Sequence, residues 1–303
     1  MRRLKNTAIF LFARAAVALA GLVPATLVRP CGAAVGSLAL LLAPRQRKLA
    51  RRQLAAAFSL QPHGRRARIL LHGVFSHLGT GAIELCRLLR RPAAPLRVEL
   101  PSPSREALER ALSRGRGAVF VTGHIGNWEL MAISLARLGY PISTVARESY
   151  DPRFTRLLDR GRSSFGVSSI FRGRPGAAAR MLRALRANRI LGFLIDQDTR
   201  VDGVFAPFFG REAHTPIGPA AIARRTGTPL LVGSIRRLRN GGHLISIQEL
   251  HLPGDDAGAA LALNAELERR VRLRPSQWVW LHDRWRTRPP DGDRAASKGQ
   301  RAA

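Results

Sequence analysis

A histidine and a glutamate five residues apart are the side chains in this sequence best suited to acid–base chemistry. His124 and Glu129 lie in the segment GHIGNWEL at 123–130, directly after the apolar run 118–122, which we predict to be a strand. The two glycines of this segment allow a tight strand-to-helix turn. Glu129 then falls in the first turn of the next helix, where its carboxylate can reach back to one imidazole nitrogen of His124. The other nitrogen is free to take a proton from a hydroxyl group that the substrate supplies.

Polar residues also follow two other predicted strands. The strand 141–146 is followed by Arg147, a candidate clamp for a phosphate or an oxyanion. The strand 190–195 is followed by the run Asp-Gln-Asp at 196–198, which could hold sugar hydroxyls, a divalent metal ion or the arginine itself. Ligands bind beyond the carboxyl ends of the strands in open α/β sheets, so we expect these residues and His124 to converge on one pocket.

Each of these residues also has an ordinary structural interpretation. His124 could be a surface histidine, Glu129 a carboxylate placed for the helix dipole, and the run 196–198 a turn and helix cap. The loop 203–215 contains three phenylalanines and could form an apolar channel wall, a lip that touches a membrane, or part of the core.

The elements that must position these residues alternate between strand and helix. Such alternation predicts an α/β fold with a central, mostly parallel sheet flanked by helices. Besides the strands already named, we predict strands at 96–100, 168–171, 230–235 and 244–250 and helices at 63–91, 104–114, 128–138, 151–164, 175–187, 216–226, 264–272 and 276–284.

The N-terminal region is hydrophobic. Residues 1–5 are basic, and the apolar run 8–28 is long enough to cross a bilayer as a helix, whereas the second run, 31–44, is too short to do so alone. We therefore predict that 1–44 form a membrane-anchoring helix or hairpin, with a cleaved signal peptide and a soluble helical hairpin as alternatives. Residues 45–288 then form the α/β domain, and 289–303 a disordered tail.

The composition excludes several protein classes and suggests an anionic partner. The chain has 303 residues and a formal net charge of +30, and its lysines are only Lys5, Lys48 and Lys298, so nearly all its cationic side chains are arginine. The two cysteines rule out a disulfide-stapled secreted fold, and no sequence pattern indicates structural zinc. A phosphate-binding glycine loop is also missing from the sequence, so nucleotide binding has no support.

Several blocks in order resemble one protein family. The segment at 123–130 contains the H-x4-E box with the Asn-Trp insert of the late (lauroyl/myristoyl) acyltransferases of lipid A biosynthesis, within the lysophospholipid acyltransferase superfamily; it also resembles the phosphatidylinositol-mannoside acyltransferases. The blocks VARE at 145–148, the Asp-Gln pair at 196–197, 204–210 and QWVWLHDRW at 277–285 follow at similar intervals. The family pattern leads us to expect Asn where this chain has Gln53.

This resemblance implies a membrane-associated O-acyltransferase on the cytoplasmic face of the inner membrane. The donor would be a thioester of acyl carrier protein or coenzyme A, the acceptor a hydroxyl of an anionic glycolipid such as a lipid A precursor, and neither a cofactor, a metal nor nucleic acid would take part. By position in the motifs, His124 is the general base and Glu129 orients it. The substrate-binding residues it implies are Arg147, Asp196, Gln197, Asn127 and Thr215.

Three other functions remain open from the sequence. A phosphatidylinositol-mannoside or glycerolipid acyltransferase would use the same chemistry on a different acceptor. A basic peripheral protein that binds a membrane or nucleic acid would use no catalysis. A metallohydrolase built on Asp196, Asp198 and His214 would depend on a metal ion.

Overall fold

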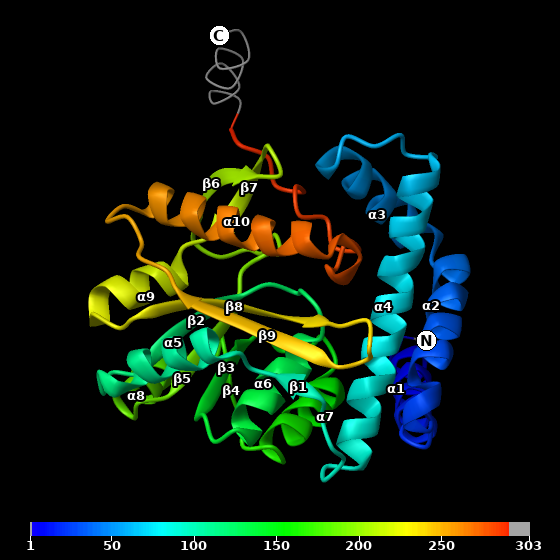
Figure 1. The fold of residues 1–303 in the computed structure, drawn as a ribbon, viewed down its shortest axis with the longest axis horizontal. Helices are drawn as coiled ribbons and strands as arrows, with labels where there is room; N and C mark the ends of the chain where they lie inside the picture. Colours follow the sequence, from blue (N-terminus) through cyan, green and yellow to red (C-terminus); the bar gives the residue numbers. More distant parts are fainter. Residues whose placement is uncertain (1, 291–303) are drawn as a thin grey trace, which may run out of the picture.

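The computed structural model describes residues 2–290 and contains an α/β unit with a layer of helices along one side (Figure 1). The tail predicted at 289–303 falls almost entirely outside the described residues. Most of the predicted elements are present within a few residues of their expected bounds.

The central sheet has seven strands in the order β1-β9-β8-β2-β5-β3-β4. Five neighbouring strands, from β8 to β4, run parallel; β9 is antiparallel to β8, and β1 runs parallel to β9. The predicted mostly parallel sheet is thus confirmed. The strands are β1 (Val98–Glu99), β2 (Ala118–Thr122), β3 (Ile142–Ala146), β4 (Ser168–Phe171), β5 (Ile190–Leu194), β8 (Leu230–Arg237) and β9 (His243–Glu249).

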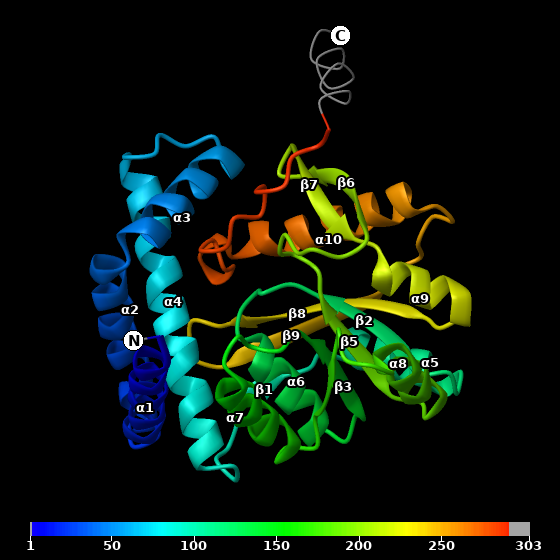
Figure 2. The same ribbon diagram turned by 180° about the vertical axis from the view of Figure 1, so that it is seen from behind.

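Helices cover both faces of this sheet (Figures 1 and 2). Successive side chains of β2 alternate between two hydrophobic cores: Val119 and Val121 pack in one, Phe120 in the other. Since side chains alternate across a strand, an all-apolar strand such as β2 requires a core on each side. The first core includes residues of α8 (Ala177–Arg186), α9 (Gly218–Thr226) and α10 (Asp256–Leu273), and the second includes residues of α5 (Ser102–Ser113) and α6 (Trp128–Arg137).

The phenylalanine-rich segment 203–215 is a β-hairpin rather than a loop. Strands β6 (Gly203–Phe208) and β7 (Arg211–Pro216) pair in antiparallel fashion. Phe208 and Phe209, at its turn, are 1% and 6% exposed and pack against Trp278 and Trp280. Of the three interpretations of this segment, core packing is therefore the one that these two rings follow.

The predicted helix at 276–284 is wrong. After α10 the chain makes one short 3-10 helix, η2 (Pro275–Gln277), and then runs irregularly through the core, where Trp278 forms an isolated bridge with Ile125. Gln53 holds this segment: its amide donates to the carbonyls of Trp280 and His282 at 2.8 Å each, and its oxygen accepts from the backbone N–H of Arg284. Gln53 thus provides hydrogen-bond partners for backbone groups of this buried segment, which has no neighbouring strand or helical turn to bind them.

The apolar run 8–28 does not form one continuous helix. Helix α1 (Arg2–Ala20) ends before Gly21, and the chain turns through η1 (Ala25–Leu27) into α2 (Val28–Leu42). The residues around Pro24 interrupt the helix because proline lacks the N–H that a helix interior needs. The N-terminal region is therefore a pair of helices, and the stretch 25–42 is long and apolar enough to cross a membrane by length and composition.

Helix α2 lies along α4 (Arg65–Arg90) in very close contact (Figure 2). A Cβ atom on Gly79 would lie 2.2 Å from the carbonyl oxygen of Gly32, and one on Gly36 would lie 2.3 Å from that of Phe75. Only glycine permits this approach. Helix α4 also passes the length and composition test for a membrane span, but its buried face packs on the α/β unit, as does α3 (Pro44–Ala57).

Candidate active site

The turn that follows β2 brings the backbone of 123–127 close to two other segments. Gly126 has φ +66°, and a Cβ there would lie 1.8 Å from the carbonyl oxygen of Ile235, so the position requires glycine. A Cβ on Gly123 would lie 2.7 Å from Asp196 Oδ2. The 277–279 segment holds the other side of the turn, with hydrogen bonds from Gly126 N–H to Gln277 O and from Val279 N–H to His124 O.

Asp196 is the carboxylate that binds His124. Its Oδ1 lies 2.7 Å from His124 Nδ1, and its Oδ2 accepts from the backbone N–H of His124 at 2.6 Å. The indole N–H of Trp278 donates to the same Oδ2, also at 2.6 Å. Since Nδ1 donates to the carboxylate, the ring adopts the tautomer that leaves Nε2 as an acceptor.

The charge of Asp196 is stabilised although the residue is 2% exposed. Burial by itself raises the pKa of this carboxyl, but the charge and hydrogen bonds of His124, together with the hydrogen bond from Trp278, outweigh it and hold the pKa below its usual value. A buried, ionised aspartate on Nδ1 fixes the orientation and the tautomer of the imidazole.

Glu129 does not make the predicted contact with His124. Its carboxylate is bound by the guanidinium of Arg162 on α7 (Pro152–Ser163) through two hydrogen bonds, from Nη2 at 2.5 Å and from Nε at 2.9 Å. Burial lowers the pKa of Arg162, and the carboxylate of Glu129 raises it by more, so the pKa lies above its usual value. The expectation that Glu129 touches the imidazole is corrected: Asp196, from another strand end, takes that position.

His124 and Glu129 line a common cavity of about 300 Å³. The cavity extends between α6 and the strands β2, β3 and β5, and its inner wall is apolar. Polar groups gather at the part nearest His124, where Arg147, Arg162, Arg172, Gln197 and Thr199 contribute to the lining. The inner wall is formed by Phe120, Met131, Ala132, Leu135, Ile142, Ile190 and Leu194.

The predicted convergence of three strand ends is therefore present. The residues after β2, β3 and β5 meet at one cavity, with Arg147 and Gln197 beside His124. Arg147 and Arg172 lie close together. Burial lowers the pKa of Arg172, and the charge of the neighbouring Arg147 lowers it further. Their proximity concentrates positive charge at this part of the cavity lining.

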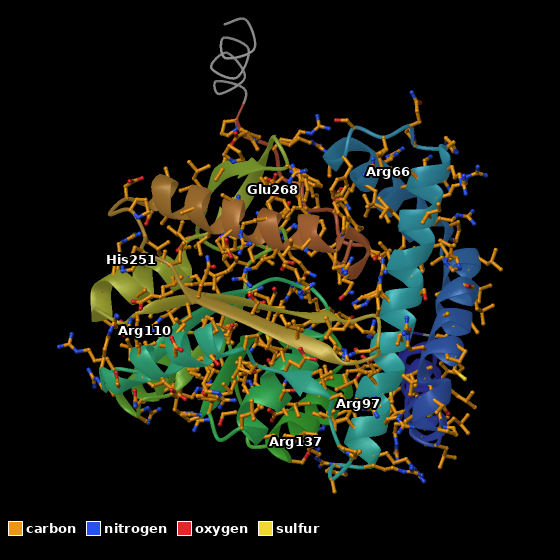
Figure 3. The ribbon with its side chains drawn as sticks, in the orientation of Figure 1. Arg66, Arg97, Arg110, Arg137, His251 and Glu268 are labelled. Carbon is orange, nitrogen blue, oxygen red and sulfur yellow. The ribbon has the colours of Figure 1, made fainter. Side chains whose placement is uncertain are left out.

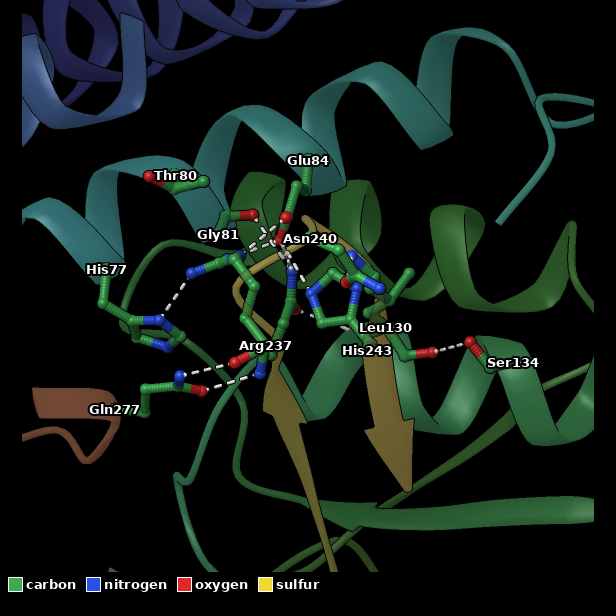
Figure 4. Close-up of polar contacts among 12 residues, drawn as sticks. His77, Thr80, Gly81, Glu84, Leu130, Ser134, Arg237, Asn240, His243 and Gln277 are labelled. Carbon is green, nitrogen blue, oxygen red and sulfur yellow. Dashed lines mark hydrogen bonds and ion pairs between the residues drawn. The ribbon is translucent and has the colours of Figure 1, made fainter. Parts of the chain in front are cut away.

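Asn127 lies behind the cavity rather than in its wall. Its side-chain oxygen accepts from the Leu130 N–H and so caps α6, while its amide donates to the Gly81 carbonyl and to Glu84, each at 3.2 Å. Glu84 in turn receives two hydrogen bonds from Arg237, at 2.6 and 2.9 Å (Figure 4). Asn127 thereby fixes the turn at 123–127 to helix α4.

Thr215 and Asp198 also lie outside this cavity. Thr215 is fully buried, and its hydroxyl accepts from Arg284 and from Asn264. Asp198 accepts from the backbone N–H and the hydroxyl of Thr287. In residues 2–290, no cluster of three or more His, Cys, Asp or Glu side chains is placed to hold a metal ion, so the metallohydrolase interpretation gains no structural support.

Arg162 and Arg172 were not identified from the sequence. Both lie among many arginines, one on α7 and one just after β4, and no spacing pattern connects either with the histidine motif. Only the folded chain brings Arg162 to Glu129, 33 positions earlier.

The fold and the site together define an α/β protein in which a carboxylate-bound histidine lines a largely apolar cavity. Comparison with known families supports a specific assignment: residues 1–287 match the family described as bacterial lipid A biosynthesis acyltransferase. The chain belongs to this family.

Curated relatives fall into two groups. The chain is 26% identical over 267 residues to the lipid A biosynthesis palmitoleoyltransferase of Escherichia coli K12 (85% of this chain, 84% of the relative) and 27% identical over 272 residues to the lauroyltransferase of the same organism (88% and 87%). It is 29% identical over 181 residues to the phosphatidylinositol mannoside acyltransferase of Mycobacterium tuberculosis H37Rv, covering 59% of this chain and 57% of the relative's length.

Proposed function

We propose that this protein transfers a fatty acyl chain from a thioester, carried by acyl carrier protein or coenzyme A, to a hydroxyl group of an anionic glycolipid, most simply a lipid A precursor. The observation that carries the proposal is the position of His124: its Nδ1 is bound by Asp196, and its side chain lines a largely apolar cavity. Family membership supports the reaction class, and the two relatives from Escherichia coli are named for lipid A acylation.

The chemistry needs a base and two bound substrates. Nε2 of His124 takes the proton of the acceptor hydroxyl as its oxygen forms a bond to the thioester carbonyl carbon. The tetrahedral intermediate then collapses, the carbon–sulfur bond breaks, and the imidazolium returns its proton to the departing thiolate. Asp196 orients the ring and stabilises its positive charge during this step.

The remaining residues of the mouth bind and position the substrates. The acyl chain occupies the apolar part of the cavity, with its thioester carbonyl near His124. Arg147 and Arg172 bind a phosphate group of the acceptor or the developing oxyanion, and Gln197 donates or accepts a hydrogen bond. Glu129 acts through Arg162: this neutral pair fixes α7 against the first turn of α6 and so shapes the entrance.

The apolar helices α1 and α2 bring the site to its lipid substrate. Leu38, Leu41 and Leu42 of α2 are 56%, 68% and 73% exposed, and Phe12 of α1 is 76% exposed. Exposed apolar surface of this extent is typical of a membrane contact. We propose that the pair lies in the cytoplasmic leaflet of the inner membrane.

The acceptor is the part of the proposal that needs the sharpest test. Purified protein in neutral detergent is given a lauroyl or palmitoleoyl thioester together with either a lipid A precursor or a phosphatidylinositol mannoside, and the products are identified by mass spectrometry. Acylation of the lipid A precursor at the higher rate supports the proposal. The local similarity to the mycobacterial enzyme favours the alternative, a preference for the mannoside. That result would keep the proposed mechanism and change the proposed acceptor.

A further inference from the structure

A second cleft, of about 510 Å³, lies on the other side of α6 from the catalytic cavity. Its walls come from the last turns of α4, the turn η1 and the start of α2, the segment before β1, and the turn between β8 and β9. We call it the α4 cleft. Leu130 of α6 faces it, whereas the neighbouring Trp128 and Glu129 line the catalytic cavity.

Three arginines line the α4 cleft: Arg29, Arg87 and Arg97. In the described part of the chain, no carboxylate forms an ion pair with any of them. Arg87 Nη1 is buried and has no hydrogen-bond partner, and Arg29 donates only to the backbone carbonyl of Arg239, at 2.6 Å. A buried guanidinium N–H without a hydrogen-bond partner costs free energy. The guanidinium of Arg87 is therefore suited to donate a hydrogen bond to a bound anion.

The acidic residue in the wall, Glu84, does not neutralise these arginines. Both of its oxygens are bound by the guanidinium of Arg237, and His243 Nε2 lies 3.5 Å from one of them (Figure 4). Burial raises the pKa of Glu84, but the hydrogen bonds and charges of His243 and Arg237 outweigh it and hold the pKa at about 2. The charges of Glu84 and Arg237 therefore cancel, and the cleft keeps the positive charge of its three other arginines.

Apolar surface adjoins this positive cleft. Val28, Leu88 and Leu96 form part of its wall. At the turn between α1 and α2, whose last residues form η1, Leu22 and Leu27 are 53% and 47% exposed. An anion-binding cleft that opens beside exposed leucines matches an amphiphile, with a charged head and hydrocarbon chains, better than a small soluble anion.

We propose that the α4 cleft binds the phosphate group of an anionic membrane lipid, with Arg87 and Arg97 as the main ligands and Arg29 at the rim. The bound lipid holds the turn between α1 and α2 at the membrane surface, next to α4. This site rests on the proposed membrane contact of α1 and α2, but not on acyl transfer.

The test measures binding of the full chain to vesicles of phosphatidylcholine with and without phosphatidylglycerol, by co-sedimentation. Arg87→Gln and Arg97→Gln each remove one ligand, and Arg110→Gln removes the same charge from an exposed position on α5, away from the cleft (Figure 3). We expect each cleft variant to weaken binding to the anionic vesicles about tenfold, since one charge-assisted hydrogen bond is lost, and Arg110→Gln to stay within about twofold. Binding to phosphatidylcholine alone should be the same for all four proteins.

Two results would overturn the proposal. Equal weakening by Arg87→Gln and Arg110→Gln would mean that diffuse surface charge drives the binding. Displacement by inorganic phosphate at concentrations similar to those of the lipid would mean that the cleft takes soluble phosphate. Hydrogen exchange provides a second readout: anionic vesicles should protect residues 84–97 and 240–243 in the parent and not in Arg97→Gln. Because no transfer rate is measured, failure of this test would leave the proposed acyl transfer unaffected.

Discussion

Asp196 binds both the ring and the backbone of His124, and it does so from the end of a different strand, 72 positions later in the chain. The two strands, β2 and β5, are neighbours in the sheet, and their carboxyl ends therefore open at one edge. The parallel sheet thus brings the proposed catalytic pair together, whereas the H-x4-E box supplies the histidine and Glu129, another residue of the cavity lining.

Replacing Asp196 by asparagine should lower the transfer rate about 10²- to 10⁴-fold, because the amide cannot stabilise the imidazolium or enforce the required tautomer. The rate is followed by thiol release from the acyl thioester in the presence of acceptor. Asn keeps one oxygen that can accept from Trp278 or His124, and an unchanged thermal unfolding midpoint, followed by circular dichroism, serves as the folding control. A rate within about threefold of the parent would exclude Asp196 as the orienting group.

Arg162→Gln should be as damaging as Glu129→Gln, with each losing roughly 10- to 100-fold in activity, since each leaves the partner's charge without its pair at the cavity entrance. The double variant Glu129→Gln/Arg162→Gln should recover part of this loss, because neither charge remains. Kinetics of the three variants test this coupling. Near-normal activity of Arg162→Gln beside an inactive Glu129→Gln would show that Glu129 acts directly on His124.

Ala132→Leu should shift the donor preference toward shorter acyl chains, because the added carbons fill the apolar part of the cavity that Ala132 lines. Competition between thioesters of different length, with products resolved by mass spectrometry, measures the shift. Ala178→Leu, on the exposed face of α8, is the matched control and should leave the preference unchanged. An unchanged preference in Ala132→Leu would place the acyl chain elsewhere.

Stability should fall as the pH is lowered below about 6.5. Burial and the charge of Arg237 lower the pKa of His77 from 6.5 to about 3, so between these values the unfolded chain binds a proton that the folded chain does not. Glu84, whose pKa is lowered from 4.5 to about 2, adds a loss in the same direction between pH 4.5 and 2. Together they are worth on the order of a few kcal/mol.

Thermal unfolding followed by the fluorescence of the buried tryptophans checks this pH dependence. The midpoint should decrease from pH 7 to pH 4.5 in the parent and decrease less in His77→Gln, which keeps an acceptor for Arg237 but does not titrate. Equal decreases in both proteins would assign the pH dependence to other groups.

Local patterns predicted most of the α/β unit. The bounds of β2 and β4 coincide with the predicted runs 118–122 and 168–171, because short apolar or β-branched segments between turn residues have few alternatives in a doubly covered sheet. The segment 276–284 misled the prediction, since Trp278, Leu281 and Trp285 follow one another at spacings of three and four positions, which also fit a helix. Tertiary packing decides there: Gln53, more than 200 residues earlier, binds the backbone groups that a helix would have used.

The candidate site could be predicted only from the rule that residues after the carboxyl ends of parallel strands meet at one edge of the sheet. His124, Arg147, Gln197 and Asp196 came from that rule, and the structure brings all four together. The identity of the orienting carboxylate did not follow, because Glu129 and Asp196 both reach the region and spacing alone cannot choose between them. Arg162 was missed since an arginine on a surface helix is ordinary until its partner is known.

The most direct test of the central claim is the transfer rate of His124→Ala, measured as thiol release from an acyl thioester with the glycolipid acceptor present. The variant removes the Nε2 that should take the hydroxyl proton and leaves the apolar cavity in place. We expect the rate to fall to that of the reaction without enzyme, with donor binding and the thermal midpoint close to those of the parent. Transfer at a rate near the parent's would show that another group performs the proton abstraction and would contradict the mechanism.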